Sequence, residues 1–141
     1  MSIRRSLPIG ILSLAMCLSA CARRVSPPSG AASTPALEVR EGLASYYGAA
    51  FHGKTTASGR RFDMNAMVAA HPSYPFGTVL RVTNLANRRQ VRLRVVDRGP
   101  AAAPRADGVI IDVSRRAAEA LGFIREGRAR IRLEVLEWGR R

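Results

Sequence analysis

This 141-residue sequence is poor in side chains that bind metals or form disulfides, since it has only two cysteines and two histidines. It contains no His-x-x-x-His or Asp-x-Asp spacing, so it predicts neither a zinc nor a calcium site, and no cofactor. A Gly-x-Ser-x-Gly elbow and an adjacent Ser-His pair are also missing, which argues against a serine nucleophile. The remaining candidates for a catalytic role are carboxylate side chains. No apolar run long enough to span a bilayer occurs in the body of the chain, which excludes a polytopic membrane protein.

The first twenty residues have the organisation of an export signal. Two arginines precede an apolar stretch, residues 7 to 18, and Leu-Ser-Ala then leads directly into Cys21. This arrangement resembles the processing box of bacterial lipoproteins, which implies cleavage before Cys21 and acylation of that residue. An ordinary secretory signal cut near Ala20 or Ala22 is the alternative. Because Ala22 is not aspartate, the resemblance implies a lipid anchor in the outer membrane facing the periplasm, with the cell membrane as the other location.

The rest of the chain divides into a tether and one folded domain. Residues 21 to 38 are rich in Pro, Ser, Ala and Gly and follow neither hydrophobic period, which predicts a flexible tether from lipidated Cys21. Residues 39 to 138 form the expected domain, and residues 139 to 141 a short tail. The length of the chain suits one domain with a single hydrophobic core. Cys17 leaves with the signal, so the mature chain has no possible disulfide.

Strict alternation of apolar and polar residues predicts that the domain is mainly β. Val91, Leu93 and Val95 alternate with arginines within 90–97, and Ile131, Leu133 and Val135 repeat the pattern. Further strands are expected at 43–47, 78–84 and 109–113, and residues 85–89 have hairpin length. One helix is expected at 115–121, with Ser114 as its cap and Gly122 at its end. Short strands with one or two short helices predict a small barrel.

The chain is strongly basic, with a net charge of +13 that falls to +11 when Arg4 and Arg5 leave with the signal. All basic residues except Lys54 are arginines. The export signal argues against nucleic acid as the partner, and the polyanions outside the inner membrane are peptidoglycan carboxylates and lipid phosphates. The alternative is that the arginines are simply the solvated faces of the strands.

Among the acids of the domain, Asp97 and Asp112 follow similar triplets, Val-Val-Asp and Ile-Ile-Asp. Asp97 ends a strand before Arg-Gly-Pro and fits a carboxylate at the barrel rim. The alternative is that it caps that turn or pairs with Arg98. Asp112 precedes Val-Ser at the start of the expected helix, which is also a capping environment. His71 fits an acid/base partner or a packed histidine bonded to backbone.

Six sequence blocks then resemble, in order, the rare lipoprotein A (RlpA-like) family: GLASYYG at 42–48, FHGKTTASG at 51–59, MVAAHPSYPFGT at 67–78, VTNLAN at 82–87, VVDRGP at 95–100 and IIDVSRRAAEALGF at 110–123. The resemblance implies a six-stranded double-psi β-barrel, shared with expansins and barwin-like proteins. It implies an endolytic lytic transglycosylase that cuts peptidoglycan glycan strands lacking stem peptides and leaves 1,6-anhydro-muramic ends. The expected partners are those strands and, through Cys21, a membrane, with the protein acting as a monomer.

Carried onto this chain, the resemblance implies Asp97, His71 and Asp112 as catalytic residues. It implies substrate contacts at a further set: Tyr46, Tyr47, His52, Thr56, Arg60 and Arg98. The sequence departs from the family pattern at Arg60, where relatives usually carry a catalytic glutamate, and an arginine cannot donate a proton at neutral pH. Either Asp97 acts with a different partner such as Asp63 or Asp112, or the protein is a noncatalytic peptidoglycan-binding or expansin-like wall-loosening lipoprotein. The chain ends at Arg141 without a SPOR module, so septal targeting is not expected.

Overall fold

The structure is a computed structural model that describes residues 34 to 140. The expected signal, the lipidation site Cys21 and most of the tether lie outside the described residues. The strands are β1 (Glu38–Tyr47), β2 (Val68–Ala70), β3 (Val79–Asn84), β4 (Gln90–Asp97), β5 (Val109–Ser114) and β6 (Arg128–Glu137). The helices are a 3-10 turn (Ala49–Phe51), α1 (Ala102–Ala106) and α2 (Arg115–Leu121).

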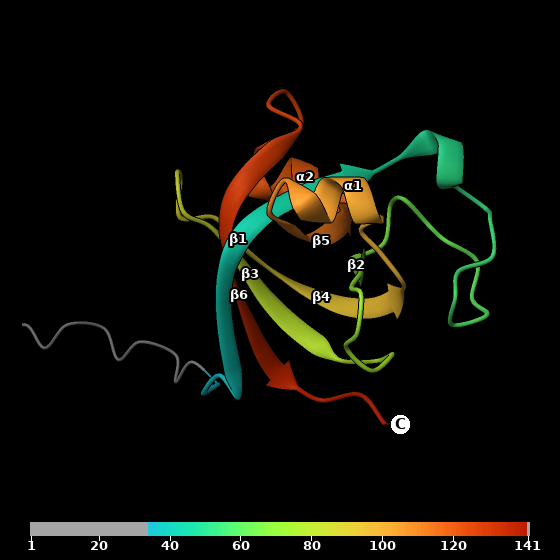
Figure 1. The fold of residues 1–141 in the computed structure, drawn as a ribbon, viewed down its shortest axis with the longest axis horizontal. Coiled ribbons are helices and arrows are strands. Elements are labelled where there is room, and N and C mark those ends of the chain that lie inside the picture. Colours follow the sequence, from blue (N-terminus) through green and yellow to red (C-terminus); the bar gives the residue numbers. More distant parts are fainter. Residues whose placement is uncertain (1–33, 141) are drawn as a thin grey trace, which may run out of the picture. The chain divides into compact units, whose positions relative to one another are not determined.

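The six strands close into a barrel in the order β1-β5-β2-β4-β3-β6 (Figure 1). β1 pairs with β5 and β2 pairs with β4 in parallel, whereas the other four pairings are antiparallel. The long segment between β1 and β2 projects from one side of the barrel, next to the carboxyl end of β4 (Figure 1). The mixed six-stranded barrel with two helices confirms the expected fold class.

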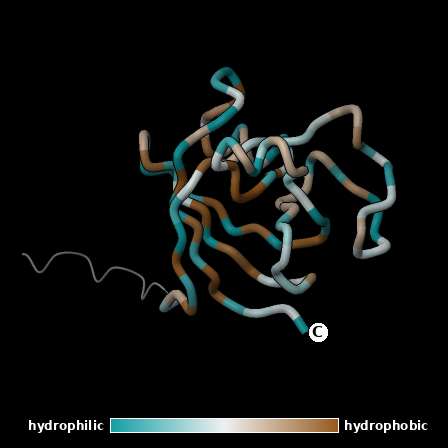
Figure 2. Tube along the Cα trace, in the orientation of Figure 1, coloured by the Kyte–Doolittle hydropathy of each residue, from teal (hydrophilic) through white to brown (hydrophobic). Residues whose placement is uncertain are grey.

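The alternating sequence produces the barrel wall because successive side chains of a strand point to opposite faces. In β4, Val91, Leu93 and Val95 are buried and the arginines between them are exposed, and the tube in Figure 2 shows this change of polarity along the strands. The interior is filled by aliphatic side chains such as Leu80, Ile111 and Leu133. Each contributes about 1.5–3 kcal/mol by leaving water.

The predicted capping of the long helix is present. Ser114 Oγ accepts a hydrogen bond from the Ala117 amide, and Gly122 is left-handed with φ of 75°. Ser114 Oγ also donates to the Ala66 carbonyl at 2.6 Å, which ties the start of α2 to the segment before β2. The helix therefore anchors the end of β5, where Asp112 lies.

Two boundaries differ from the sequence prediction. β1 begins at Glu38, which the sequence assigns to the tether, because the pairing of β1 with β6 continues to Val135. Gly139, the first residue of the expected tail, donates its amide to Thr78 Oγ1 at 3.0 Å. The sequence analysis also did not specify β2 or α1. β2 pairs with both strands that carry the candidate acids, and α1 lies between those two strands in the sequence.

Candidate active site

Asp97 and Asp112 lie on either side of the same short strand. Ala70 of β2 pairs with Asp97 of β4 on one side and with Asp112 of β5 on the other. Ser45 of β1 continues the row, because it pairs with Asp112. Neighbouring strands are about 4.8 Å apart, so the two aspartate Cα atoms are separated by about 10 Å. The topology thus places two carboxylates in one row of the barrel wall.

Asp97 is held by backbone amides. Its Oδ1 accepts hydrogen bonds from the amides of Ala57 and Arg98, each at 2.8 Å. The first amide belongs to the segment between β1 and β2, so Asp97 joins that segment to the end of β4. Within residues 34–140, Oδ2 has no such partner and remains available to a ligand.

Asp112 has a different environment. It is largely shielded from solvent, and this burial raises the pKa of its carboxyl, whereas a hydrogen bond from Ser45 Oγ and the charge of Arg128 oppose the rise. Gly99 lies over its other oxygen: a Cβ at that position would be 3.2 Å from Asp112 Oδ2. The glycine leaves this oxygen approachable. Asp112 is therefore the carboxyl group better suited to carry a proton.

The Tyr47 hydroxyl lies close to both acids. Burial raises the pKa of Tyr47, and the charges of Asp97 and Asp112 raise it further. The ring stacks on Phe62 at 4.1 Å between centroids and contacts Phe51 edge-on at 5.8 Å. The hydroxyl oxygen is buried and has no hydrogen-bond partner within the described residues. An unpaired buried hydroxyl is costly unless a ligand completes its hydrogen bonds.

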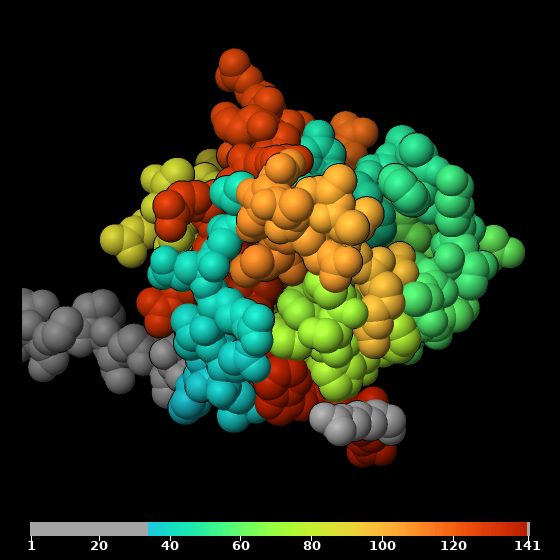
Figure 3. Space-filling view, viewed as in Figure 1, coloured from blue at the N-terminus to red at the C-terminus, as the bar shows by residue number. Residues whose placement is uncertain are grey.

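These groups line one pocket, here called the acid pocket, with a volume of about 210 Å³. Its walls are formed by Tyr47, Phe51, Ala70, Asp97, Arg98, Gly99, Ala101 and Asp112. In the space-filling view, the residues around α1 (orange) and the segment after β1 (green) approach each other on one face of the molecule (Figure 3). The acid pocket combines aromatic surface with two carboxyl groups that can donate and accept protons.

Arg98 does not neutralise Asp97 with its guanidinium. Arg98 Nη1 donates to the Tyr74 carbonyl at 2.9 Å and to the His71 carbonyl at 3.4 Å, and the guanidinium lies 3.9 Å from the centroid of Phe76. Only the backbone amide of Arg98 reaches the Asp97 carboxylate. The carboxylate is therefore capped by the turn, as one alternative from the sequence states, but is not tied up in an ion pair.

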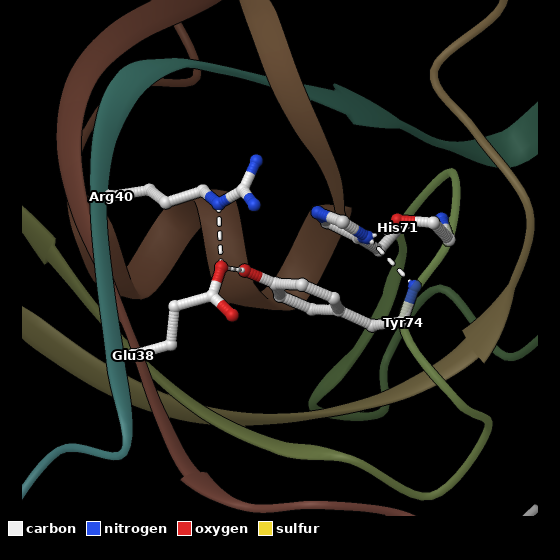
Figure 4. A network of polar contacts seen from close by, with 5 residues as sticks. Glu38, Arg40, His71 and Tyr74 are labelled. Atoms are coloured by element: carbon white, nitrogen blue, oxygen red, sulfur yellow. Dashed lines mark hydrogen bonds and ion pairs between the residues drawn. The ribbon is translucent and has the colours of Figure 1, made fainter.

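His71 is adjacent to Asp97 through its backbone but belongs to a separate side-chain network. Its amide donates to the Asp97 carbonyl at 3.1 Å. Its Nδ1 accepts from the Tyr74 amide at 3.0 Å, and the two rings stack at 3.6 Å. Tyr74 donates its hydroxyl to Glu38, which also pairs with Arg40 (Figure 4).

The His71 imidazole is held neutral in this network. Burial and the charge of Arg40 lower its pKa to about 4, against the opposing effect of Glu38. Because Nδ1 accepts a hydrogen bond, the neutral ring carries its proton on Nε2. That nitrogen points toward Arg40 (Figure 4), and His71 is not among the residues that line the acid pocket.

The remaining predicted contact residues do not line the acid pocket. Tyr46 points to the opposite face of β1 from Tyr47, where its hydroxyl donates to the Ile124 carbonyl at 3.4 Å. His52 is exposed and has its Nδ1 3.8 Å from Asp63 Oδ1. Thr56 Oγ1 donates to the Arg60 carbonyl at 2.8 Å, which shapes the turn that presents the Ala57 amide. Arg60 lines a neighbouring pocket.

The sequence analysis did not identify several residues that build this site. Ser45 holds Asp112, Phe51 and Gly99 complete the pocket, and Glu38 anchors the network around His71. The two similar triplets that end in Asp97 and Asp112 were the available signal, because both lie in strands that pair with β2. The other residues are brought to the acids by loops whose paths the sequence pattern does not specify.

Within residues 34–140, no group of three His, Cys, Asp or Glu side chains is arranged to hold a metal ion. Over the same residues, none of the helices has the length and hydropathy that crossing a bilayer requires.

The comparison with protein families decides the membership of the chain. A family profile described as "Lytic transglycolase" matches residues 39–133. The chain belongs to this family. Its barrel is therefore an RlpA-like double-psi β-barrel, as the resemblance implies.

Curated relatives named "Endolytic peptidoglycan transglycosylase RlpA" match most of the chain. The protein of Campylobacter jejuni is 48% identical over 102 residues, which are 72% of this chain and 36% of that relative. The protein of Neisseria meningitidis is 44% identical over 123 residues, 84% of this chain and 50% of the relative. The chain thus spans half or less of the length of these relatives.

Solved structures support the fold alone. The Streptomyces papain inhibitor superimposes with a TM-score of 0.57 at 22% identity, over 73% of this chain and 98% of the inhibitor. An expansin of Clavibacter michiganensis gives a TM-score of 0.55 at 23% identity, over 74% of this chain and 53% of that chain. A variant of that expansin, solved in complex with cellohexaose, gives a TM-score of 0.54 at 21% identity, over 70% and 50% of the two chains.

Proposed function

We propose that this protein is an endolytic peptidoglycan lytic transglycosylase that cuts glycan strands lacking stem peptides. One observation carries the proposal: two carboxyl groups from equivalent triplets flank Ala70 in one pocket, and they differ in environment. Paired carboxyl groups whose surroundings separate their proton affinities are the usual basis of acid and base roles in glycoside cleavage. The relatives with this activity in their names support the same conclusion.

In the proposed reaction, Asp112 is the general acid. Burial raises the pKa of its carboxyl, so it retains a proton to higher pH than an ordinary aspartic acid. It donates this proton to the glycosidic oxygen as the bond from that oxygen to the muramic C1 breaks. A positioned acid of this kind contributes about 100- to 10,000-fold to the rate.

Asp97 is the general base. The muramic 6-hydroxyl attacks its own C1, and its proton passes to a carboxylate oxygen of Asp97. The products are a 1,6-anhydro-muramic end and a free hydroxyl on the departing sugar. No water is consumed, and solvent restores the two protonation states. The unpaired Tyr47 hydroxyl is placed to bond the bound sugar between the acids.

This assignment does not need the family glutamate that Arg60 replaces. Asp112 supplies the proton instead. It lies on β5, across Ala70 from Asp97, whereas Arg60 lies in the segment between β1 and β2. His71 acts as a positioning residue in the proposal, because its amide binds the Asp97 carbonyl while its ring is held by Tyr74.

The location of the reaction is part of the proposal. The processing box before Cys21 supports a lipid anchor, and residues 22 to 37 would let the domain reach the wall from the periplasmic face of the outer membrane. Metabolic labelling of the protein with a fatty acid, compared with Cys21→Ser, tests the anchor. Fractionation of the two membranes tests the location.

The activity is tested by incubating the chain from Ala22 onward with denuded glycan strands and detecting 1,6-anhydro ends by mass spectrometry. We expect these ends from the wild type and their loss in Asp97→Asn and Asp112→Asn. Binding without any anhydro product would support the wall-binding alternative instead.

A further inference from the structure

A second pocket adjoins the acid pocket at the end of β4. It has a volume of about 290 Å³ and is lined by Ser58, Arg60, Phe76, Gly77, Arg94, Val95 and Val96. We call it the arginine pocket, because its charged lining residues are two arginines and it contains no carboxylate among the residues that line it.

The residues that line the two pockets follow one another along β4. Val95 and Val96 line the arginine pocket, and Asp97, the next residue of β4, lines the acid pocket. The Ser58 amide donates to the Val96 carbonyl at 3.3 Å, and the Ala57 amide donates to Asp97 Oδ1 at 2.8 Å. A strand rises about 3.3 Å per residue, so Val95 and Asp97 are only about 7 Å apart along β4. A glycan strand in the acid pocket therefore has its neighbouring substituents within reach of the arginines.

The fold holds the backbone of Arg60 and one guanidinium nitrogen of Arg94, and within residues 34–140 the other guanidinium donors of both have no hydrogen-bond partner. The Arg60 carbonyl accepts from the Thr56 amide at 2.7 Å and from Thr56 Oγ1 at 2.8 Å, which fixes its backbone in the turn. Arg94 Nη1 donates to the Gly77 carbonyl at 3.0 Å, and Gly77 also lines the arginine pocket. A guanidinium has five N–H donors in a planar fork that matches a carboxylate.

We propose that Arg60 and Arg94 bind the free lactyl carboxylate of a muramic acid residue next to the cleaved bond. This inference rests on the proposed function, because it assumes a glycan strand in the acid pocket. A stem peptide converts that carboxylate into an amide, which removes the charge and adds bulk. The arginine pocket is thus a specificity site that favours strands without stem peptides.

Binding measurements on two forms of the same glycan test the assignment. Labelled denuded strands, and the same strands with their lactyl carboxylates converted to methylamides, are titrated with the chain from Ala22 onward carrying Asp112→Asn to prevent cleavage. We expect amidation to weaken binding about tenfold, the loss of one charge-assisted contact. Arg60→Gln or Arg94→Gln should weaken binding to the free strands similarly and leave binding to the amidated strands nearly unchanged.

Arg125→Gln is the matched control, because it removes the same charge from an exposed position in the turn between α2 and β6. It should weaken both forms little and equally. Strands that keep their stem peptides distinguish a lactyl carboxylate from a peptide carboxylate, and they should bind as weakly as the amidated strands. Thermal unfolding of each variant checks that the barrel is intact.

The inference is overturned if Arg60→Gln and Arg94→Gln weaken free and amidated strands equally, or if neither variant changes the binding. Cleavage is scored separately, as 1,6-anhydro ends formed by the chain with Asp112 intact. Anhydro ends without discrimination between the two strand forms would refute the arginine pocket alone. Discrimination without anhydro ends would refute the proposed cleavage and leave the arginine pocket in place.

Discussion

Asp112 receives a hydrogen bond from Ser45 of the neighbouring strand, whereas Asp97, in the same row of the barrel wall, is bonded by backbone amides of the turns around it. The side-chain donor can be removed by mutation without altering the backbone, and the amide donors cannot. The two acids are thus open to separate experimental tests.

Substitution of Asp112 by Asn should lower cleavage by about 100- to 10,000-fold, because the proton donor is lost. It should also raise the melting temperature at pH 7, since an acid whose pKa is raised by burial destabilises the fold once it ionises. Anhydro-end counts and calorimetry check the two effects. An inactive variant with a lowered melting temperature would point to misfolding instead.

Replacing Ser45 by Ala should move the alkaline limb of the activity profile to higher pH. The Ser45 hydroxyl favours the ionised form of Asp112, so its removal raises the pKa of the carboxyl further and keeps the acid protonated longer. The initial rate of anhydro-end formation, measured across the pH range, tests this shift. A limb that does not move, or that moves to lower pH, would rule out Asp112 as the group that sets it.

Tyr47→Phe should make the fold more stable and substrate binding weaker. The unpaired buried hydroxyl costs about 1 kcal/mol or more in the free protein, so its removal should increase the free energy of unfolding by about that amount. At the same time, KM for glycan strands should rise, because the bound sugar loses a partner. A variant with unchanged KM would show that the hydroxyl has no contact with substrate.

The His71 network should make stability depend on pH in a defined window. The folded pKa of about 4 is below the ordinary value near 6.5, so the unfolded chain binds the extra proton between these values. Stability is full above about pH 6.5 and decreases by about 3 kcal/mol as the pH falls to 4. Urea unfolding across this range measures the slope, which His71→Gln should flatten and His52→Gln should not.

Arg60→Glu tests whether the family glutamate is needed in this barrel. We expect weaker binding to denuded strands, because the new carboxylate repels the lactyl carboxylate that the guanidinium is proposed to bind. We expect no gain in the rate at saturating substrate. Steady-state kinetics on anhydro-end formation separate KM from kcat. A large gain in kcat, retained when Asp112 is changed to Asn, would transfer the acid role from Asp112 to position 60.

The sequence predicted the elements whose pattern is strong. The alternation from Gln90 to Asp97 predicted the observed limits of β4, and Ser114 with Gly122 predicted the limits of α2. β2 has only three residues, too few to show a period, so the pattern did not reveal it. α1 contains Pro104 and no apolar stripe, and it too was not specified.

The same contrast holds for the candidate site. Asp97 and Asp112 were recognisable as acids at or near strand ends, but their placement beside Ala70 depends on one parallel and one antiparallel pairing between distant segments. His71 illustrates the limit: its motif suggested proximity to Asp97, which is true of its backbone, whereas stacking on Tyr74 directs its ring toward Arg40. Side-chain direction there depends on Glu38, far away in the sequence.

The brevity of β2 has a dynamic consequence. Both acids are aligned by a strand of three residues, and only Ala69 and Ala70 of it pair with β5. Opening this one segment would separate Asp112 from Asp97 while the other five strands remain paired. Deuterium uptake at the amides of these two alanines would therefore measure how often the two acids come apart, and a bound oligosaccharide that bridges both acids would slow that uptake.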